Sequence, residues 1–590
     1  MPAYTVSATI PWDSYLLKHE VWSYPDHAVI GPTYWKIPIE ELFFFGIQTY
    51  LTSVLYLVIA KSVVPTAYLP ILSPPSPSLS VEGEISGTTT INDSRKMRRK
   101  SVTGGVVLIA LIAIGAKLVQ NGGHGTYFGL ILVWAGPVLL FLWCLSRHYI
   151  LSISRKNVLI PILLPTAYLW IVDTLALKNG TWVISPDKSL QIKLWRHLDI
   201  EEAVFFLVTN TLITFGQLAI DHTLAVLNGF PEAFPSPISS WPPIDLLVRG
   251  LCVPVKDYPS QRILGLKKAI SKLYGKSRSF SLASSVFEGR LRIDLTLLYA
   301  FCRNADDLID EAETTKEAQE ALSKLSQAVC HAFSCRACAK QATIDGTNKD
   351  TTAHKEAVNS LPDEMAMSLE MLPLEILPLH AIHELLNGFD MDLQFPTSPR
   401  RSNGIFPIKT EQDLKRYSYC VAGTVAELLL TLVFHHAATG SEVTKSGREE
   451  VDRCIRAGVN MGIALQYINI ARDIAKDAAM GRCYIPSDWL AEFKLTPRMI
   501  VADPYMPAVE KFRQRILNIA MDLYHANKGA IERLPQGSGA RKGVRAAVEN
   551  YVEIGRVLQE RQSKMPTTAG EQATVGKARR LWVFLKALCA

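Results

Sequence analysis

The sequence predicts an all-α protein in which a multi-span membrane half precedes a soluble helical half. Charge is distributed unevenly, because 33 of residues 1–250 are charged against 84 of residues 251–590. The mean hydropathy of the whole chain is +0.14, which is high for a protein that is soluble throughout. The first half also contains apolar stretches long enough to cross a bilayer, and the second contains long amphipathic segments.

The overall composition excludes several other classes of protein. Ten cysteines in 590 residues are too few for a disulfide scaffold and favour a reducing compartment. A hydrophobic content of 48% excludes general disorder. The net charge of +7 comes without lysine runs interleaved with aromatic residues, so nucleic-acid binding is not expected. The N-terminus lacks the basic-then-apolar layout of a signal peptide.

Five apolar stretches with almost no internal charge occupy the first half. A membrane-spanning helix needs about 20 such residues, and five of them exceed what a soluble core requires. We therefore expect spans at about 42–60, 104–120, 126–146, 157–177 and 202–220. Between the first two, residues 70–103 are rich in Pro, Ser, Thr and Gly and end in a basic run, which predicts a flexible loop with a membrane-proximal basic end.

Positive charge on alternate loops predicts the orientation of these spans. The loops at 61–103 and 147–156 carry nine Lys and Arg residues, against six on the opposite side. The positive-inside rule places the first set in the cytosol. Five spans then leave the soluble half in the cytosol as well.

The membrane half contains an internal repeat. From Pro-Asp to Ile-Glu-Glu the two copies keep a constant offset of 161 residues. The matching segments are Trp22–Asp26 with Ile39–Glu41, and Trp182–Asp187 with Ile200–Glu202. This predicts a domain at 1–228 built from copies at about 11–120 and 126–225.

The same repeat extends upstream to a pair of aspartates. Asp13 lies nine residues before Trp22, and Asp173 lies nine before Trp182. Asp173 falls within an expected span that follows another span, whereas only twelve residues precede Asp13. We therefore expect either that the sequence begins late within its first copy or that this form lacks two helices of that copy.

The Glu-Glu pairs at two predicted helix starts allow two interpretations. Acidic residues in a first helical turn stabilise the helix, which would be a purely structural role. Alternatively, carboxyls at an apolar boundary act as general acids, and the parity of the spans puts both pairs on one membrane side. Nearby aromatic residues could stabilise a carbocation; they are Trp22, Phe43, Phe44, Trp182, Phe205 and Phe206. The second interpretation predicts protonation of a lipid-soluble polyene, without assigning acid or base among Glu40, Glu41, Glu201 and Glu202.

The soluble half begins after a Pro-rich linker at 229–261. Its helical periodicity predicts an all-α domain over 262–590, with a polar surface insert at 335–365. The long amphipathic segments are 262–275, 291–311, 411–436, 449–478, 507–528 and 543–561.

Two aspartate motifs stand out in this domain. Asp306 and Asp310 share one helix face, as do Asp473 and Asp477. Like charges at this spacing repel unless a cation lies between them, and Mg²⁺ prefers a few carboxylates together with phosphate oxygens. A solvated acidic face would explain one such motif more readily than two. With Arg303, Arg472 and Arg482 as charge-assisted donors, the pattern predicts loss of diphosphate to leave a carbocation.

These motifs resemble those of the squalene and phytoene synthase family from about 262 to 560. The resemblance is carried by Ser277–Phe280, both aspartate motifs, Tyr417 with Val421–Gly423, and Gly481–Pro486. Ser418 stands where the family usually has a cysteine.

The resemblance implies a helical bundle around a long apolar cavity. It implies Mg²⁺ (or Mn²⁺) at Asp306, Asp310, Asp473 and Asp477, and diphosphate at Arg303, Asn469, Arg472 and Arg482. The residues implied to line the reaction centre or bind substrate are Ser279, Phe280, Tyr299, Tyr417, Tyr484 and Tyr551. The implied reaction joins two geranylgeranyl diphosphates head to head into phytoene, without NADPH.

The membrane half is similar, over about 11–225, to the small, flavin-independent lycopene cyclase domain. The fusion resembles the bifunctional lycopene cyclase/phytoene synthases of carotenogenic fungi, which carry seven spans against the five expected here. It implies acid-catalysed cyclisation of lycopene to β-ring products such as γ- and β-carotene. It also implies contact with membrane lipid, an endomembrane such as the endoplasmic reticulum, and a phytoene desaturase as a possible partner.

Two alternatives stay open at this stage. The membrane half could be an inactive anchor for a phytoene synthase. The soluble half could instead be a squalene-type synthase that uses farnesyl diphosphate and a reductant.

Overall fold

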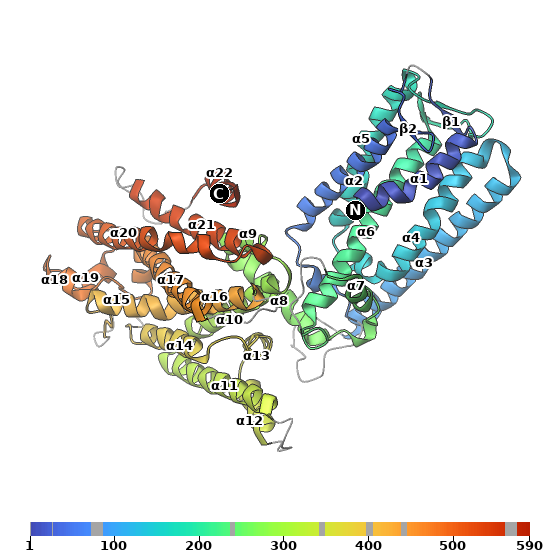
Figure 1. Ribbon diagram of the computed structural model, residues 1–590. Coiled ribbons are helices and arrows are strands. Elements are labelled where there is room, and N and C mark those ends of the chain that lie inside the picture. The colour runs from blue at the N-terminus through green and yellow to red at the C-terminus, as the bar shows by residue number, and fades with distance from the viewer. Residues whose placement is uncertain are drawn as a thin grey trace. The chain divides into compact units, whose positions relative to one another are not determined.

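The computed structural model describes residues 2–25, 28–71, 87–235, 242–341, 349–396, 405–437, 445–560 and 575–589. Over these residues the protein is helical, with only six strands of two or three residues each (Figure 1). The all-α prediction is therefore confirmed. The chain divides into two compact units, Met1–Ser236 with Trp241–Ile263, and Pro237–Ser240 with Leu264–Ala590.

Where it is described, the first unit contains six long α-helices and one short one that lie wholly within it. They are α1 (Pro2–Lys18), α2 (Ile39–Ala60), α3 (Gly87–Asn121), α4 (Thr126–Ser152), α5 (Arg155–Lys178), α6 (Ile200–Gly229) and α7 (Ile244–Leu251). Each of the five expected spans lies inside one of α2 to α6, and all five helices are long and apolar enough to cross a membrane. A sixth such stretch, Glu411–Ala437, lies in the second unit.

Two sequence predictions for the first unit need correction. Residues 87–103 were expected in a flexible loop but form the start of α3, since Arg and Lys are good helix formers and extend the apolar helix beyond its hydrophobic part. Residues 72–86 of that loop lie outside the described residues. The linker at 229–261 also contains a helix, α7, whose apolar and polar residues separate onto opposite faces.

The internal repeat is visible in the local structure. A hairpin of β2 (Thr33–Tyr34) and β3 (Ile37–Pro38) leads into α2, and a hairpin of β5 (Lys193–Trp195) and β6 (Leu198–Asp199) leads into α6. The two copies also meet, because β1 (Trp22–Ser23) pairs antiparallel with β4 (Val183–Ile184). Inside the bundle, the amide of Gln48 donates to Thr209 Oγ1 at 2.9 Å, 161 residues away.

The second unit is a larger helical array. Its helices are α8 (Ser260–Lys276), α9 (Arg278–Ser284), α10 (Gly289–Asp310), α11 (Thr315–Gln341), α12 (Lys349–Asn359), α13 (Asp363–Glu370), α14 (Leu379–Leu393), α15 (Glu411–Ser418), α16 (Thr424–Ala437), α17 (Lys445–Ala479), α18 (Ser487–Ala491), α19 (Pro497–Ala502), α20 (Pro507–Asn527), α21 (Ala540–Glu560) and α22 (Lys577–Cys589). The polar insert at 335–365 is mostly helical where it is described.

Helix α17 runs through the core of this unit and packs against α16, α20 and α21. A π-helical turn at Tyr419–Gly423 joins α15 to α16 and crosses α17 closely. A side-chain carbon at Gly462 would meet the Ala422 carbonyl oxygen at 2.6 Å, so glycine is needed at the crossing. This crossing fixes the end of α15, which carries Tyr417.

Candidate active sites

The first aspartate motif lies on the last turns of α10, where neighbouring aspartates have different partners. Arg303 Nη1 donates to Asp306 Oδ2 at 2.9 Å, and its Nη2 lies 2.7 Å from Asp307 Oδ1. Asp307 also pairs with α8, through Lys272 Nζ at 3.0 Å and Lys276 Nζ at 3.4 Å. Asp307 therefore anchors α10 to α8, and Asp306 and Asp310 are left on the other face.

The second aspartate motif lies at the end of α17. Arg472 binds Asp473 through two bonds, Nε to Oδ1 at 2.8 Å and Nη2 to Oδ2 at 2.5 Å. One turn earlier, the buried Asn469 Oδ1 has no hydrogen-bond partner among the described residues. Burial, and then the carboxylate of Asp473, raise the pKa of Asp477 to about 7. The positive charges of Arg482 and Lys476 oppose this shift.

Arg482 connects the two motifs. It follows a tight turn in which Gly481 has φ of +80°, and its backbone N–H donates to the Asp477 carbonyl at 2.8 Å. Its Nη2 donates to Asp310 Oδ1 at 2.8 Å. Arg482 thus joins the acidic ends of α10 and α17, through its guanidinium on one side and its backbone N–H on the other. These ends are more than 160 residues apart in sequence.

The donor set suits Mg²⁺ only when phosphate oxygens complete it. No group of three or more Asp, Glu, His or Cys side chains among the described residues is arranged to hold a metal by itself. Arginine side chains form ion pairs with Asp306, Asp310 and Asp473 instead. Because Mg²⁺ uses one or two carboxylates per ion with substrate phosphates and water, the aspartates fit a metal that arrives with a diphosphate.

A half-buried carboxylate that sequence reasoning missed lies beside these motifs. Asp392 on α14 accepts hydrogen bonds from Tyr484 Oη at 2.7 Å and from Tyr417 Oη at 3.1 Å. Burial raises the pKa of Asp392 to about 6, although Arg482 opposes the shift. Nothing in the sequence distinguished it, because the same helix also carries Glu384, Asn387 and Asp390.

Aromatic side chains predicted at the reaction centre form two groups. Phe280 lies 5.8 Å from Tyr299 and 5.5 Å from Tyr551, measured between ring centroids. Tyr417 and Tyr484 stack at 4.8 Å. The side chain of Ser279 lies outside the described residues.

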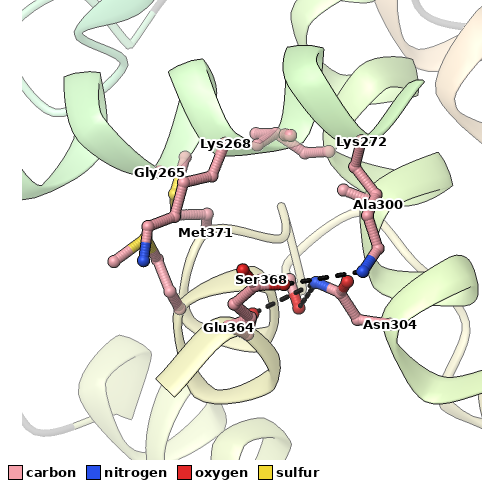
Figure 2. Close-up of a pocket in the computed structure, with 11 residues that line it drawn as sticks. Gly265, Lys268, Lys272, Ala300, Asn304, Glu364, Ser368 and Met371 are labelled. Atoms are coloured by element: carbon pink, nitrogen blue, oxygen red, sulfur yellow. Dashed lines mark hydrogen bonds and ion pairs between the residues drawn. The ribbon is translucent and has the colours of Figure 1, made fainter. Parts of the chain in front are cut away.

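A small pocket is lined by residues of α8, α10 and α13 (Figure 2). Asn304 Nδ2 donates to the Glu364 carbonyl at 3.2 Å and to Ser368 Oγ at 3.3 Å. Lys272 Nζ lies 3.5 Å from Glu364 Oε2. None of the residues predicted to bind substrate lines this pocket. Its polar contacts join α13 to α10 and to α8.

In the first unit, the structure separates the four predicted glutamates into two kinds. Glu40 Oε1 accepts from the Ile30 N–H at 2.7 Å, and Glu201 Oε1 accepts from the Leu190 N–H at 2.6 Å. These two glutamates close equivalent hairpin loops in the two copies.

The neighbouring glutamates bind tyrosines instead. Tyr24 Oη donates to Glu41 Oε2 at 2.5 Å, and the fully buried Tyr127 donates to Glu202 Oε1 at 2.7 Å. The charges of Glu41 and Glu202 both act on Tyr24, so the two copies contribute to one cluster of acidic groups.

Two aspartates that were noted only as repeat markers join this cluster. Asp13 and Asp173 are 0% and 1% exposed. Asp13 lies beside Glu41, and Asp173 interacts with Glu202. Their matching positions in the repeat were the signal that could have identified them as site residues.

An aromatic cluster surrounds these carboxyls. Trp12 stacks on Trp134 at 4.4 Å and on Phe205 at 5.6 Å, and Trp22 packs edge-on against Tyr127 at 5.5 Å. Phe44 and Phe206 also belong to it. The prediction for Phe43 was wrong, since its side chain is 69% exposed on the outer face of α2; Trp12 and Trp134 were not predicted.

Comparison with known proteins covers almost the whole chain. The family described as Squalene/phytoene synthase matches residues 273–579. A bifunctional lycopene cyclase/phytoene synthase of Leptosphaeria maculans is 45% identical over 583 residues, which is 99% of this chain and 92% of the relative. The protein of the same name from Gibberella fujikuroi is 43% identical over 585 residues, again 99% and 92%. A crystal structure of a dehydrosqualene synthase in complex with ligand aligns with a TM-score of 0.39 at 19% identity, over 55% of this chain and 95% of that one.

Proposed function

The chain belongs to the bifunctional lycopene cyclase/phytoene synthase family, and from this we propose how its two units divide the work. The second unit condenses two geranylgeranyl diphosphates to phytoene. The first unit cyclises lycopene to β-ring carotenoids without net oxidation or reduction.

The observation that carries the synthase assignment is the arginine bridge between the two aspartate motifs. Asp306, Asp310, Asp473 and Asp477 would hold Mg²⁺ (or Mn²⁺), which neutralises the charge on the departing diphosphate. The guanidiniums of Arg303, Arg472 and Arg482 already lie on these carboxylates. Diphosphate oxygens offer them the same bidentate geometry, so these arginines exchange partners when substrate binds.

The aromatic side chains then stabilise the carbocations. Ionisation of one diphosphate leaves an allylic cation, which alkylates the second substrate and forms a cyclopropyl diphosphate. A second ionisation, rearrangement and loss of a proton give phytoene, so no reductant is consumed. The rings of Phe280, Tyr299 and Tyr551 present π faces to these cations, and Asp392 fixes the hydroxyls of Tyr417 and Tyr484.

A substrate comparison tests this against a squalene-type synthase. Membranes containing the full chain are supplied with Mg²⁺ and labelled C15 or C20 diphosphate, with and without NADPH. We expect phytoene from the C20 substrate at the same rate in both conditions. Squalene from the C15 substrate, formed only with NADPH, would contradict the proposal.

The cyclase assignment rests on buried carboxyls inside an aromatic cluster. Glu41 and Glu202 face that cluster, whereas Glu40 and Glu201 bind hairpin N–H groups, so we assign the chemistry to the first two. Expression in bacteria that make lycopene should give β-ring carotenoids. Unaltered lycopene beside active phytoene synthesis would instead support an inactive anchor.

We also propose a multi-pass arrangement in an endomembrane such as the endoplasmic reticulum, with the synthase unit in the cytosol. Helices α2 to α6 are the proposed spans, because the sixth apolar stretch holds Tyr417 in contact with Asp392 and packs its π-helical turn on α17. Phytoene released at the membrane is available to a phytoene desaturase. Protease digestion of sealed vesicles tests the orientation: the second unit should be cut only where the cytosolic face is outside.

A further inference from the structure

Asp13 is a carboxyl buried without a hydrogen-bond donor. It is 0% exposed, and among the described residues neither of its oxygens has an N–H or O–H partner. Its neighbour is another carboxyl, that of Glu41. Two adjacent carboxyls in an apolar interior cannot both ionise, because desolvation and mutual repulsion oppose the second charge. The pair must therefore share one proton.

The hydrogen bonds show which member of the pair keeps that proton. Tyr24 donates to Glu41 at 2.5 Å, and a donor stabilises the ionised form of a carboxyl. Asp13 has no such donor among the described side chains. The resting arrangement is consequently a neutral Asp13 beside an ionised Glu41.

The second copy also places a tyrosine donor on its glutamate and none on its aspartate. Asp173 is 1% exposed and, where the structure is described, both of its oxygens lack a partner. Glu202, which interacts with it, accepts from Tyr127 at 2.7 Å. Tyr24 precedes α2 whereas Tyr127 lies in α4, so the two tyrosines are not equivalent in the repeat. The tyrosine that donates to the glutamate therefore comes from a different element in each copy.

The aromatic cluster includes the residue that precedes Asp13 in the sequence. Trp12 precedes Asp13 in α1 and stacks on both Trp134 and Phe205, whose own ring centroids are 6.2 Å apart. The π faces of tryptophan are the strongest cation binders among side chains.

Resting on the proposed cyclase function, we propose that Asp13 and its counterpart Asp173 are the proton donors for ring formation, and that Glu41 and Glu202 are the acceptors. The aspartic acid proton bonds to the terminal double bond of lycopene, whose π electrons form the new C–H bond. The resulting tertiary cation is attacked by a double bond further along the chain, which closes the ring. A proton then leaves the ring to the glutamate carboxylate, and its bonding electrons form the ring double bond. Transfer of that proton from glutamate to aspartate restores the starting state, so no other reactant is consumed.

Isosteric variants of the full chain in lycopene-making bacteria test the assignment. Asp13→Asn and Asp173→Asn should each lower ring formation by about 100-fold or more, since general acid catalysis contributes about 10²–10⁴-fold. Phytoene synthesis by the same chain should be unchanged, which shows that each variant is made and inserted. Asp245→Asn, an exposed aspartate of α7, is the matched control and should cyclise at the wild-type rate. Wild-type ring formation in either test variant would overturn the role of that aspartate, whereas absence of rings in the wild type would refute the cyclase function itself.

A lipid-soluble carbodiimide provides a second measurement on the wild-type protein. Carbodiimides react with protonated carboxyls, so dicyclohexylcarbodiimide should label Asp13 and Asp173 and leave Glu41 and Glu202 unlabelled. Added lycopene should protect the labelled sites. Labelling of the glutamates in place of the aspartates, read by mass spectrometry of the peptides, would overturn the assignment even if an Asn variant failed to fold.

Discussion

Both units have carboxyl groups at their candidate sites, but the partners of these carboxyl groups differ. In the second unit, Asp306, Asp310 and Asp473 each lie against an arginine. In the first unit, Asp13 and Asp173 have no N–H or tyrosine O–H donor among the described residues, and Glu41 and Glu202 each accept from a tyrosine hydroxyl. A carboxyl paired with a guanidinium stays ionised and can exchange that partner for a metal and diphosphate. A buried carboxyl without a cation retains a proton and can transfer it. Under the proposed functions, each unit would generate carbocations, one by removing an anion and the other by adding a proton.

The largest effect should come from removing a charge in the synthase unit. Asp306→Asn keeps the shape of the side chain but removes a predicted metal ligand, and we expect phytoene synthesis to fall by about 10³-fold, as for loss of a preorganised electrostatic group. Cyclisation of supplied lycopene should continue at the wild-type rate. Loss of both activities together would break the comparison, because the two sites would then depend on each other.

The next effect separates adjacent glutamates in the membrane unit. Glu202→Gln should lower ring formation by about 10²-fold, since it removes a proton-transfer group. Glu201→Gln is the matched variant and should cost only a few-fold, because an amide oxygen can still accept from the Leu190 N–H. Product analysis in lycopene-making cells measures both variants. A larger loss in Glu201→Gln than in Glu202→Gln would reverse the assignment of the pair.

Sequence patterns predicted features that depend on local spacing. The Asp-x-x-x-Asp spacing selected Asp306 and Asp310 over Asp307, and the structure pairs Asp307 with the lysines of α8 instead. The spacing could not separate Glu202 from Glu201, because both side chains are buried and only their hydrogen-bond partners differ. Helix α1 was missed for two reasons. At 17 residues it is short for a membrane span, and it contains Pro11. Asp392 was missed because its role arises only where α14 meets the residues after α17.

A smaller effect tests the tyrosine donors that distinguish the membrane carboxyls. Tyr127→Phe removes the hydroxyl that donates to Glu202 and leaves the ring in the core. Ring formation should fall by about 10-fold, since a hydrogen bond to a charged group contributes about 1.5–3 kcal/mol. Trp22 packs edge-on against the ring of Tyr127, and that contact should survive in the variant. An unchanged cyclisation rate would show that the hydroxyl does not stabilise the glutamate charge.

The smallest effect concerns stability and separates Asp307 from Asp306. Asp307 is a mostly buried carboxylate held by Arg303, Lys272 and Lys276, and these cations and hydrogen bonds lower its pKa although burial opposes them. Asp307→Asn should therefore destabilise the synthase unit by about 1–2 kcal/mol, the range for hydrogen bonds between charged groups that are partly exposed to water. The Mg²⁺ concentration that Asp307→Asn needs for phytoene synthesis should match wild type, whereas that of Asp306→Asn should shift. Thermal inactivation of phytoene synthesis measures the first quantity, and a metal titration measures the second. A shifted metal dependence in Asp307→Asn would mean that this aspartate, and not its neighbour alone, faces the diphosphate.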